Sequence, residues 1–148
     1  MAQLEVLQAQ SALSEAIRQL KEKNLFSDEN AAAILAPGAE LMLANAKSAF
    51  LQSGHNNTKP RRTGDTFKAF YRAQKVFKDK NGAPYMFVSL EGKDRRGQRY
   101  GAKAFILNYG RRTGGKIPAD YYLSNAVKAT RPQANRLMVQ KIEEILKK

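Results

Sequence analysis

Apolar side chains recur at helical spacing over two stretches in the N-terminal third of the chain. Over residues 3–22 this spacing predicts one amphipathic helix. Its apolar positions are Val6, Leu13, Ile17 and Leu20. A second helix is predicted to begin after Ser27, a favourable N-cap residue, and to end near Gly54. Pro37 interrupts the second pattern, so either that helix kinks there or a short turn precedes a new helix that begins with Pro37.

The middle of the chain alternates apolar and polar residues with a period of two, which is typical of strands. The alternation runs first from Phe67 to Ala73. Asn81-Gly82 is a strong hairpin signal, and the stretch Tyr85 to Leu90 is predicted as the return strand. Residues 102–109 are predicted as a third strand, with Phe105 and Leu107 on one side and Ile106 on the other.

The helical pattern returns at the C-terminal end, first over residues 121–129 and then from a fresh start near Pro132. The last helix has an apolar stripe of Leu137, Met138, Ile142, Ile145 and Leu146. This order of elements predicts an α+β fold, in which N-terminal and C-terminal helices flank an antiparallel sheet of three or more strands. We expect one domain over residues 1–148, with residues 1–25 as a helical extension.

Composition limits the chemistry that this chain can perform. Its 148 residues are 43% hydrophobic, which fits one globular domain with a modest core. Because there is no cysteine, a disulfide framework, a thiolate zinc site and a thiol nucleophile are excluded. His55 is the single histidine, which excludes a multi-histidine metal cluster. With no evident signal peptide and no apolar stretch long enough to span a bilayer, we expect a soluble intracellular protein.

The positive charge is concentrated in the middle of the chain. Residues 1–50 hold 4 Lys/Arg and 6 Asp/Glu, residues 51–116 hold 16 and 4, and residues 117–148 hold 6 and 3, for a total net charge of +13. Such a concentration indicates a polyanionic partner, which can be an acidic protein surface or a nucleic acid. The alternative is a solvated lysine-rich face that only keeps the protein soluble.

Three loops carry the arginines of this region. The tetrapeptide Arg-Arg-Thr-Gly occurs in two of them, and paired arginines can hold carboxylates or phosphates bidentately. The candidate interaction residues are Arg61, Arg62, Thr63, Gly64, Arg95, Arg96, Arg99, Tyr109, Gly110, Arg111, Arg112 and Lys116. Each loop can equally be a solvated turn, in which glycine supplies a positive φ.

Catalysis and nucleotide binding are not expected. Gly110 to Lys116 fits the G-x-x-x-x-G-K part of a phosphate-binding loop, but Ile117 stands where a hydroxyl must hold magnesium. The acidic residues of the basic region show no pairing typical of a metal site, so no catalytic residue, cofactor or metal is predicted. Six aromatic residues lie on or beside the predicted strands, and we expect them in the core rather than stacking on bases. They are Tyr71, Tyr85, Phe87, Tyr100, Phe105 and Tyr109.

The order of several short motifs resembles a phage protein family over residues 34–148. A helix ending in Ala-Lys-x-Ala precedes a basic Pro-x-x-Thr-Gly loop at residues 60–64, and Tyr109-Gly110 then leads into a glycine-rich loop. Pro118 and the aromatic pair Tyr121-Tyr122 precede the C-terminal helix. These features are similar to the tail-completion or head–tail joining proteins of long-tailed bacteriophages, which include gene-product-ten-like minor tail components. The chain departs from that pattern at Asn108, where the family often has Glu.

The resemblance implies a structural virion protein that is not an enzyme. Family members are small α+β subunits that form a ring, typically of six, in the neck between the portal-side adaptor and the tail tube or tail terminator. The implied locations are the virion neck and, during assembly, the host cytoplasm, and the free subunit can be a monomer. The basic loops would contact neighbouring subunits, the adaptor, the tail end or passing DNA. The alternative from another class is a small basic nucleic-acid-binding module that uses the same arginines.

Overall fold

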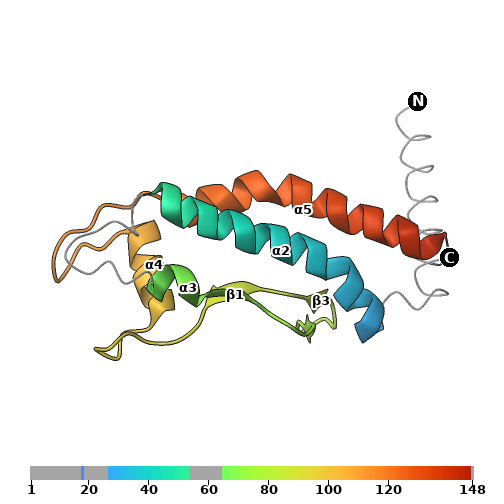
Figure 1. Cartoon of the computed structure of the whole chain (residues 1–148), viewed down its shortest axis with the longest axis horizontal. Coiled ribbons are helices and arrows are strands. Elements are labelled where there is room, and N and C mark those ends of the chain that lie inside the picture. The colour runs from blue at the N-terminus through green and yellow to red at the C-terminus, as the bar shows by residue number, and fades with distance from the viewer. Residues whose placement is uncertain (1–17, 19–26, 54–64, 148) are drawn as a thin grey trace.

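The computed structural model describes Arg18 and residues 27–53 and 65–147 (Figure 1). Its elements are the helices α2 (Asp28–Gln52), α3 (Asp65–Ala69), α4 (Tyr100–Tyr109) and α5 (Tyr122–Leu146), and the strands β1 (Phe70–Arg72), β2 (Phe77–Lys78), β3 (Pro84–Tyr85) and β4 (Val88–Leu90). The fold is α+β with antiparallel strands, as predicted. Apart from Arg18, the predicted helix over residues 3–22 lies outside the described residues, as does most of the predicted extension over residues 1–25.

Two long helices form one layer of the molecule. α2 and α5 run side by side in opposite directions over most of their length (Figure 1). Gly38 of α2 is buried against Ala134 of α5, so the two backbones approach closely at this crossing. Further along, Asn45 Nδ2 donates a hydrogen bond of 2.8 Å to Thr130 Oγ1, and the Thr130 residue is only 2% exposed. Small side chains and one satisfied polar pair therefore hold the helix layer together.

The four short strands form one interrupted antiparallel ribbon. β1 pairs with β4, with Tyr71 opposite Ser89, and β2 pairs with β3, with Phe77 opposite Tyr85. Between the two ladders, residues 73–76 stand opposite only residues 86–87, so the ribbon has a bulge there. The ribbon turns at Asn81-Gly82, where Gly82 has a φ of +80°, which confirms the predicted hairpin.

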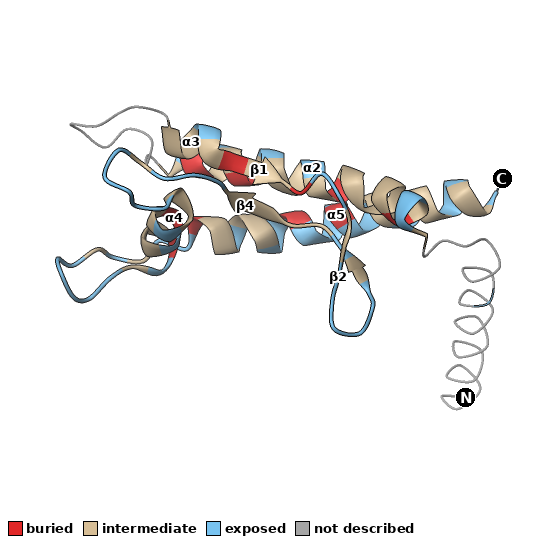
Figure 2. Ribbon diagram, turned by 90° about the horizontal axis from the view of Figure 1, so that it is seen from below, coloured by how far each residue is buried: buried red, intermediate tan, exposed pale blue. Residues whose placement is uncertain are grey.

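The ribbon covers one face of the helix layer (Figure 2). Phe50 of α2 is central to this contact, because its ring lies 5.6 Å from the ring of Phe70 in β1 and 5.9 Å from that of Tyr122 in α5. Ala46 completes the buried cluster. Burial raises the pKa of the Tyr122 phenol well above its ordinary value. The core therefore lies where α2, the ribbon and the start of α5 meet.

The predicted third strand over residues 102–109 is wrong, because these residues form most of α4. Ala104 and Asn108 are its buried residues, one helical turn apart, and Leu107 packs against the core cluster. Alanine, leucine and lysine favour the helix, and a short apolar run does not by its period alone distinguish a strand from a helix. Among the described residues there are consequently two sheets of two strands, and a sheet of three or more strands is not found.

Two further boundaries differ from prediction. α5 continues through Pro132, so the predicted fresh start near that residue is absent. α2 also continues through Pro37, which excludes the alternative in which a new helix begins there. Packing between the two helices offsets the backbone hydrogen bond that each proline removes. The alternation that begins at Phe67 is also interrupted, because α3 precedes β1. Ser27 is the N-cap of α2 as predicted, and its side chain accepts a bond of 3.3 Å from the Asn30 amide.

Candidate interaction surface

Two basic loops lie at the two ends of α4. Loop 93–99 precedes the helix and loop 110–117 follows it, so a helix of 10 residues, about 15 Å long, separates them. Both loops lie at the end of the molecule away from the C-terminus, where α2 also ends (Figure 1). The predicted residues in these loops, namely Arg95, Arg96, Arg99, Arg111, Arg112 and Lys116, are all exposed.

Loop 93–99 is a tight turn that is organised by Asp94. Asp94 Oδ1 accepts the backbone amides of Arg96 at 2.8 Å and Gln98 at 2.9 Å, while Lys103 of α4 forms an ion pair with Asp94 Oδ2. The hydrogen bond from Lys103 is the main reason that the pKa of the Asp94 carboxyl is lowered from its ordinary value of 3.8. The arginines of this turn are therefore exposed, while its one carboxylate binds the backbone of the turn and Lys103.

Asp79 builds the hairpin turn between β2 and β3 in the same way. Its Oδ1 accepts the amides of Asn81 at 2.8 Å and Ala83 at 2.9 Å. Each turn has a glycine of positive φ three residues after its aspartate, Gly82 at +80° and Gly97 at +77°. The pattern Asp-x-x-Gly thus folds twice into the same three-residue hairpin loop.

Loop 110–117 is closed by its own backbone. Arg111 and Ile117 exchange two hydrogen bonds, of 2.8 and 2.9 Å, and Arg111 Nε donates to the Gly115 carbonyl at 3.1 Å. Gly110 ends α4 with a φ of +80°, and an added Cβ there would lie 2.7 Å from the Ile117 carbonyl oxygen. Only glycine fits this position, which explains the Tyr109-Gly110 pair as a helix end and corrects its prediction as a strand end.

Three exposed aromatic residues lie beside these loops. Phe105 and Tyr109 of α4 and Tyr121 before α5 are 61%, 52% and 50% exposed. The Phe105 and Tyr109 rings are 4.6 Å apart, and the Tyr109 and Tyr121 rings are 6.2 Å apart at nearly a right angle. We call loops 93–99 and 110–117 together with these three rings the α4 surface. The prediction that Phe105 and Tyr109 belong to the core is wrong, because they point away from the buried face of α4.

The other predicted core aromatics divide in the same way. Tyr85 is 42% exposed at the ribbon edge, so that prediction is also wrong. Tyr71, Phe87 and Tyr100 are partly buried, and the Tyr71 and Phe87 rings meet edge to face at 6.1 Å. Of the six aromatic residues predicted in the core, three are therefore partly buried and three are exposed.

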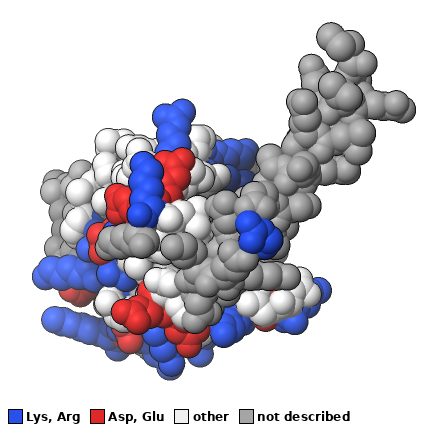
Figure 3. All heavy atoms as spheres, turned by 90° about the vertical axis from the view of Figure 1, so that its right-hand side faces the viewer, with Lys and Arg blue, Asp and Glu red and all other residues white. Residues whose placement is uncertain are grey.

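The α4 surface is strongly cationic. Residues 91–117 contain eight Lys/Arg and two Asp/Glu, and one of those acids, Asp94, is already paired. The opposite end of the molecule carries acidic and basic side chains close together (Figure 3). Lys78 forms an ion pair with Asp28 at 3.4 Å, and Lys141 with Glu144 at 3.1 Å. The excess charge is therefore directional and not spread evenly over the surface.

The predicted residues Arg61, Arg62, Thr63 and Gly64 lie outside the described residues, and so does His55. The end of α2 and the start of α3, which flank residues 54–64, lie at the same end of the molecule as the α4 surface (Figure 1). Tyr109 and Gly110 are part of that surface.

The described residues contain neither a metal-ligand cluster nor a phosphate-binding loop. Within residues 27–53 and 65–147, no group of three or more His, Asp or Glu side chains could hold a metal ion. The G-x-x-x-x-G-K segment follows helix α4 and is closed between Arg111 and Ile117, whereas a phosphate-binding loop joins a strand to the helix that it opens. Within the same ranges, no helix has the length and apolarity to cross a bilayer.

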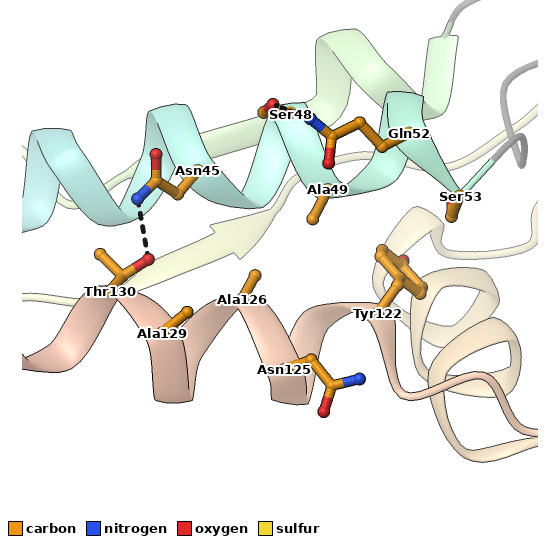
Figure 4. A pocket seen from close by; sticks show the side chains of 10 residues that line it. All are labelled: Asn45, Ser48, Ala49, Gln52, Ser53, Tyr122, Asn125, Ala126, Ala129 and Thr130. Atoms are coloured by element: carbon orange, nitrogen blue, oxygen red, sulfur yellow. Dashed lines mark hydrogen bonds between the residues drawn. The ribbon is translucent and has the colours of Figure 1, made fainter.

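An uncharged hollow lies between α2 and α5, on the face of the helix layer away from the ribbon (Figure 4). Its lining is uncharged and consists of Asn45, Ser48, Ala49, Gln52, Ser53, Tyr122, Asn125, Ala126, Ala129 and Thr130. The hydrogen bond between Asn45 and Thr130 closes one end of it. It contains none of the predicted interaction residues.

Two residues that organise the α4 surface were missed by the sequence reasoning. Asp94 is not among the predicted interaction residues, although its spacing to Gly97 matches that of Asp79 to Gly82. Asn108 was noted only as a departure from the family pattern, yet it is 2% exposed and bonded to the start of α5. The repeated Asp-x-x-Gly was a usable signal for the first residue. The second depends on a tertiary contact that has no local pattern.

No protein-family model matches this chain, and no curated protein and no solved structure matches it either.

Proposed function

We propose that this chain is a structural subunit of a bacteriophage particle that joins head and tail and forms a ring in the neck. The order of motifs over residues 34–148 suggests this family. The observation that supports a joining role is the α4 surface, on which exposed aromatic rings lie between two arginine loops. Aromatic residues and arginine are the side chains that protein interfaces favour. An exposed group of both, on rigid elements, suits docking better than catalysis.

The arginine loops are proposed to contact acidic surfaces of the neighbouring neck proteins. Arg112 is exposed, and Arg95 and Arg96 project from a turn whose backbone is fixed by Asp94. Because the loops are preorganised, little conformational entropy is lost when they bind. Oligomer formation would then place several copies of the same basic surface around one axis.

The test is a complementation experiment with a phage that lacks its own copy of the chain. Replacement of Arg61, Arg62, Arg111 and Arg112 by Ala is expected to leave a folded protein and to block the joining of heads to tails, so that unjoined heads and tails accumulate. Lys75 and Lys80 replaced by Ala form a control, because they are exposed on the ribbon away from α4. A normal virion yield from the arginine variant would contradict the loop assignment.

The same cationic surface also suits a nucleic acid, which is the second candidate function. Exposed aromatic rings beside arginines can stack on bases. Binding through phosphates weakens steeply as the salt concentration rises, because the counterions released on binding then gain less entropy. We would measure the affinity of the purified protein for a short duplex across a salt series. Tight binding that survives about 0.15 M salt favours this candidate. Binding that is gone at that salt leaves the joining role in place.

A further inference from the structure

A groove runs beside β4, where this strand faces α4 and α5. Its apolar lining comes from all three elements and includes Val88, Leu90, Ala104 and Val127. Phe105 and Tyr109 line its end near the α4 surface. The groove is distinct from the arginine loops, none of whose predicted arginines lines it.

A second hollow continues this groove toward the ribbon turn. The two hollows share Val88 and Arg131 in their linings. The second is lined by three methionines, Met42, Met86 and Met138, which are three of the four in the chain. Methionine side chains are flexible and polarizable, so they adapt to varied apolar side chains in a partner.

The charge of this groove has one sign. Lys128 and Arg131 of α5 are the charged side chains that line the two hollows, and both are exposed. Neither forms an ion pair with an acidic residue in the described parts of the chain. A partner that fills the groove therefore needs apolar side chains for the floor and carboxylates for these two cations.

The groove also contains a free strand edge. β4 pairs with β1 on one side, and in the described sheet it has no partner on the other. Val88, Ser89 and Leu90 line the groove, so an extended segment could add to this edge through main-chain hydrogen bonds. Along such a segment, alternate side chains point to the same face.

We propose that this groove binds an extended acidic segment of another protein, with large apolar side chains at alternate positions and carboxylates between them. The apolar side chains lie against the valine, leucine and methionine floor, and the carboxylates meet Lys128 and Arg131. A second copy of this chain is a poor occupant, because its described residues contain no segment that alternates large apolar side chains with carboxylates. The proposal goes beyond the joining role and concerns a groove that shares only Phe105 and Tyr109 with the α4 surface.

The test uses the full chain with methyl-labelled methionine and a labelled twelve-residue peptide in which Asp and Leu alternate. The peptide is expected to shift the methyl signals of Met86 and Met138. Individual Met→Leu variants assign the signals. Peptides that alternate Lys with Leu, or Asp with Ser, are expected to bind at least about tenfold more weakly, because each lacks one of the two complementary features.

Charge variants on α5 provide the matched control. Lys128→Glu with Arg131→Glu is expected to weaken binding of the Asp/Leu peptide by about tenfold or more. Arg136→Glu with Lys147→Glu makes the same change of net charge at exposed positions of the helix region that do not line the groove, and is expected to have little effect. Equal losses in the two double variants would overturn the proposal, because they would show attraction to net charge alone.

Two other results would also overturn it. One is the absence of methyl shifts at Met86 and Met138 in the presence of the Asp/Leu peptide. The other is a short DNA duplex that shifts these signals at lower concentration than the peptide, which would assign the groove to a nucleic acid. Since the readout is direct binding to the groove, its outcome is separate from the complementation result that tests the joining role.

Discussion

The side-chain oxygen of Asn108 accepts the backbone amide of Leu123 at 2.9 Å, so a residue of α4 caps the first turn of α5. The same oxygen accepts the Ser124 amide at 3.1 Å, and Asn108 Nδ2 donates to Ser124 Oγ at 2.9 Å. Tyr121, which occupies the N-cap position itself, has a left-handed conformation and makes no side-chain cap bond. Asn108 therefore supplies acceptors that a helix start needs and fixes the two helices that bound loop 110–117.

Replacement of Asn108 by Ala is expected to lower the free energy of unfolding by about 2–3 kcal/mol, because two partly buried backbone amides would lose their acceptor. Urea denaturation would measure the loss. Asn125→Ala is the matched control, since Asn125 is exposed on α5, the helix that Asn108 caps, and it should change stability by less than about 0.5 kcal/mol. Similar losses in the two variants would contradict the capping role of Asn108.

Gly110→Ala is expected to destabilise the protein far more than Gly114→Ala, although both glycines lie in one loop. Gly110 combines a φ of +80° and a ψ of 177°, and an added Cβ would meet the Ile117 oxygen at 2.7 Å and the Ala119 nitrogen at 2.8 Å. Gly114, with a φ of +69°, has nothing within 4 Å of an added Cβ.

Backbone strain of about 1–2 kcal/mol is the whole expected cost at Gly114, whereas Gly110→Ala should cost about 3 kcal/mol or more. Thermal unfolding of both variants would compare them. A Gly110→Ala protein as stable as Gly114→Ala would show that the loop moves aside without cost.

The sequence predicted those helices in which apolar residues recur at helical spacing over many residues, and the turn whose residues are adjacent in the chain. The helix after Ser27 and the final helix are examples of the first kind, and the Asn81-Gly82 hairpin is an example of the second. The pattern failed over residues 102–109, where a run of eight residues fits a strand and a helix equally well. It also failed at Pro132 and left two alternatives open at Pro37, because the packing of α2 against α5 that tolerates a proline is a tertiary effect.

The sequence predicted which charged residues belong to the candidate site, but not how they and the aromatic rings are arranged in space. The arginines of loops 93–99 and 110–117 were identified from charge, and the structure places them at the two ends of one helix. The exposed position of Phe105 and Tyr109 could not be predicted while residues 102–109 were taken as a strand, since the face that a residue occupies depends on the period. The cap from Asn108 joins elements 15 residues apart, so no local pattern indicates it.

Gly38→Ala is expected to stabilise the protein by about 0.5–1 kcal/mol, because alanine favours a helix over glycine by that amount. Although Gly38 is buried, an added Cβ would lie 3.5 Å from the Ala134 oxygen and 3.6 Å from Met138 Cγ, which is ordinary contact. Gly38→Leu is the opposing variant and should be destabilising, since the crossing has no room for four carbons. Urea denaturation of both would test this, and a loss of stability in Gly38→Ala would show that the helices are closer than described.

The ion pair between Asp94 and Lys103 is expected to make loop 93–99 sensitive to acid. The Lys103 ammonium lowers the pKa of the Asp94 carboxyl from its ordinary value of 3.8 in the folded protein, whereas the unfolded chain keeps the ordinary value. Ionised Asp94 therefore stabilises the fold above about pH 4, and this contribution is lost as the pH falls through the lower, folded-state pKa.

Asp94→Asn should consequently lose more stability at neutral pH than Asp79→Asn, and the excess should disappear on acidification. Asp79 is the matched control because it makes the same two turn bonds and, in the described residues, no ion pair. Urea denaturation at several pH values would measure the excess, and NMR titration of the Asp94 carboxyl would locate its pKa directly. Lys103→Met should abolish the excess if Lys103 causes it, and an excess that survives this change would assign the effect to the turn alone.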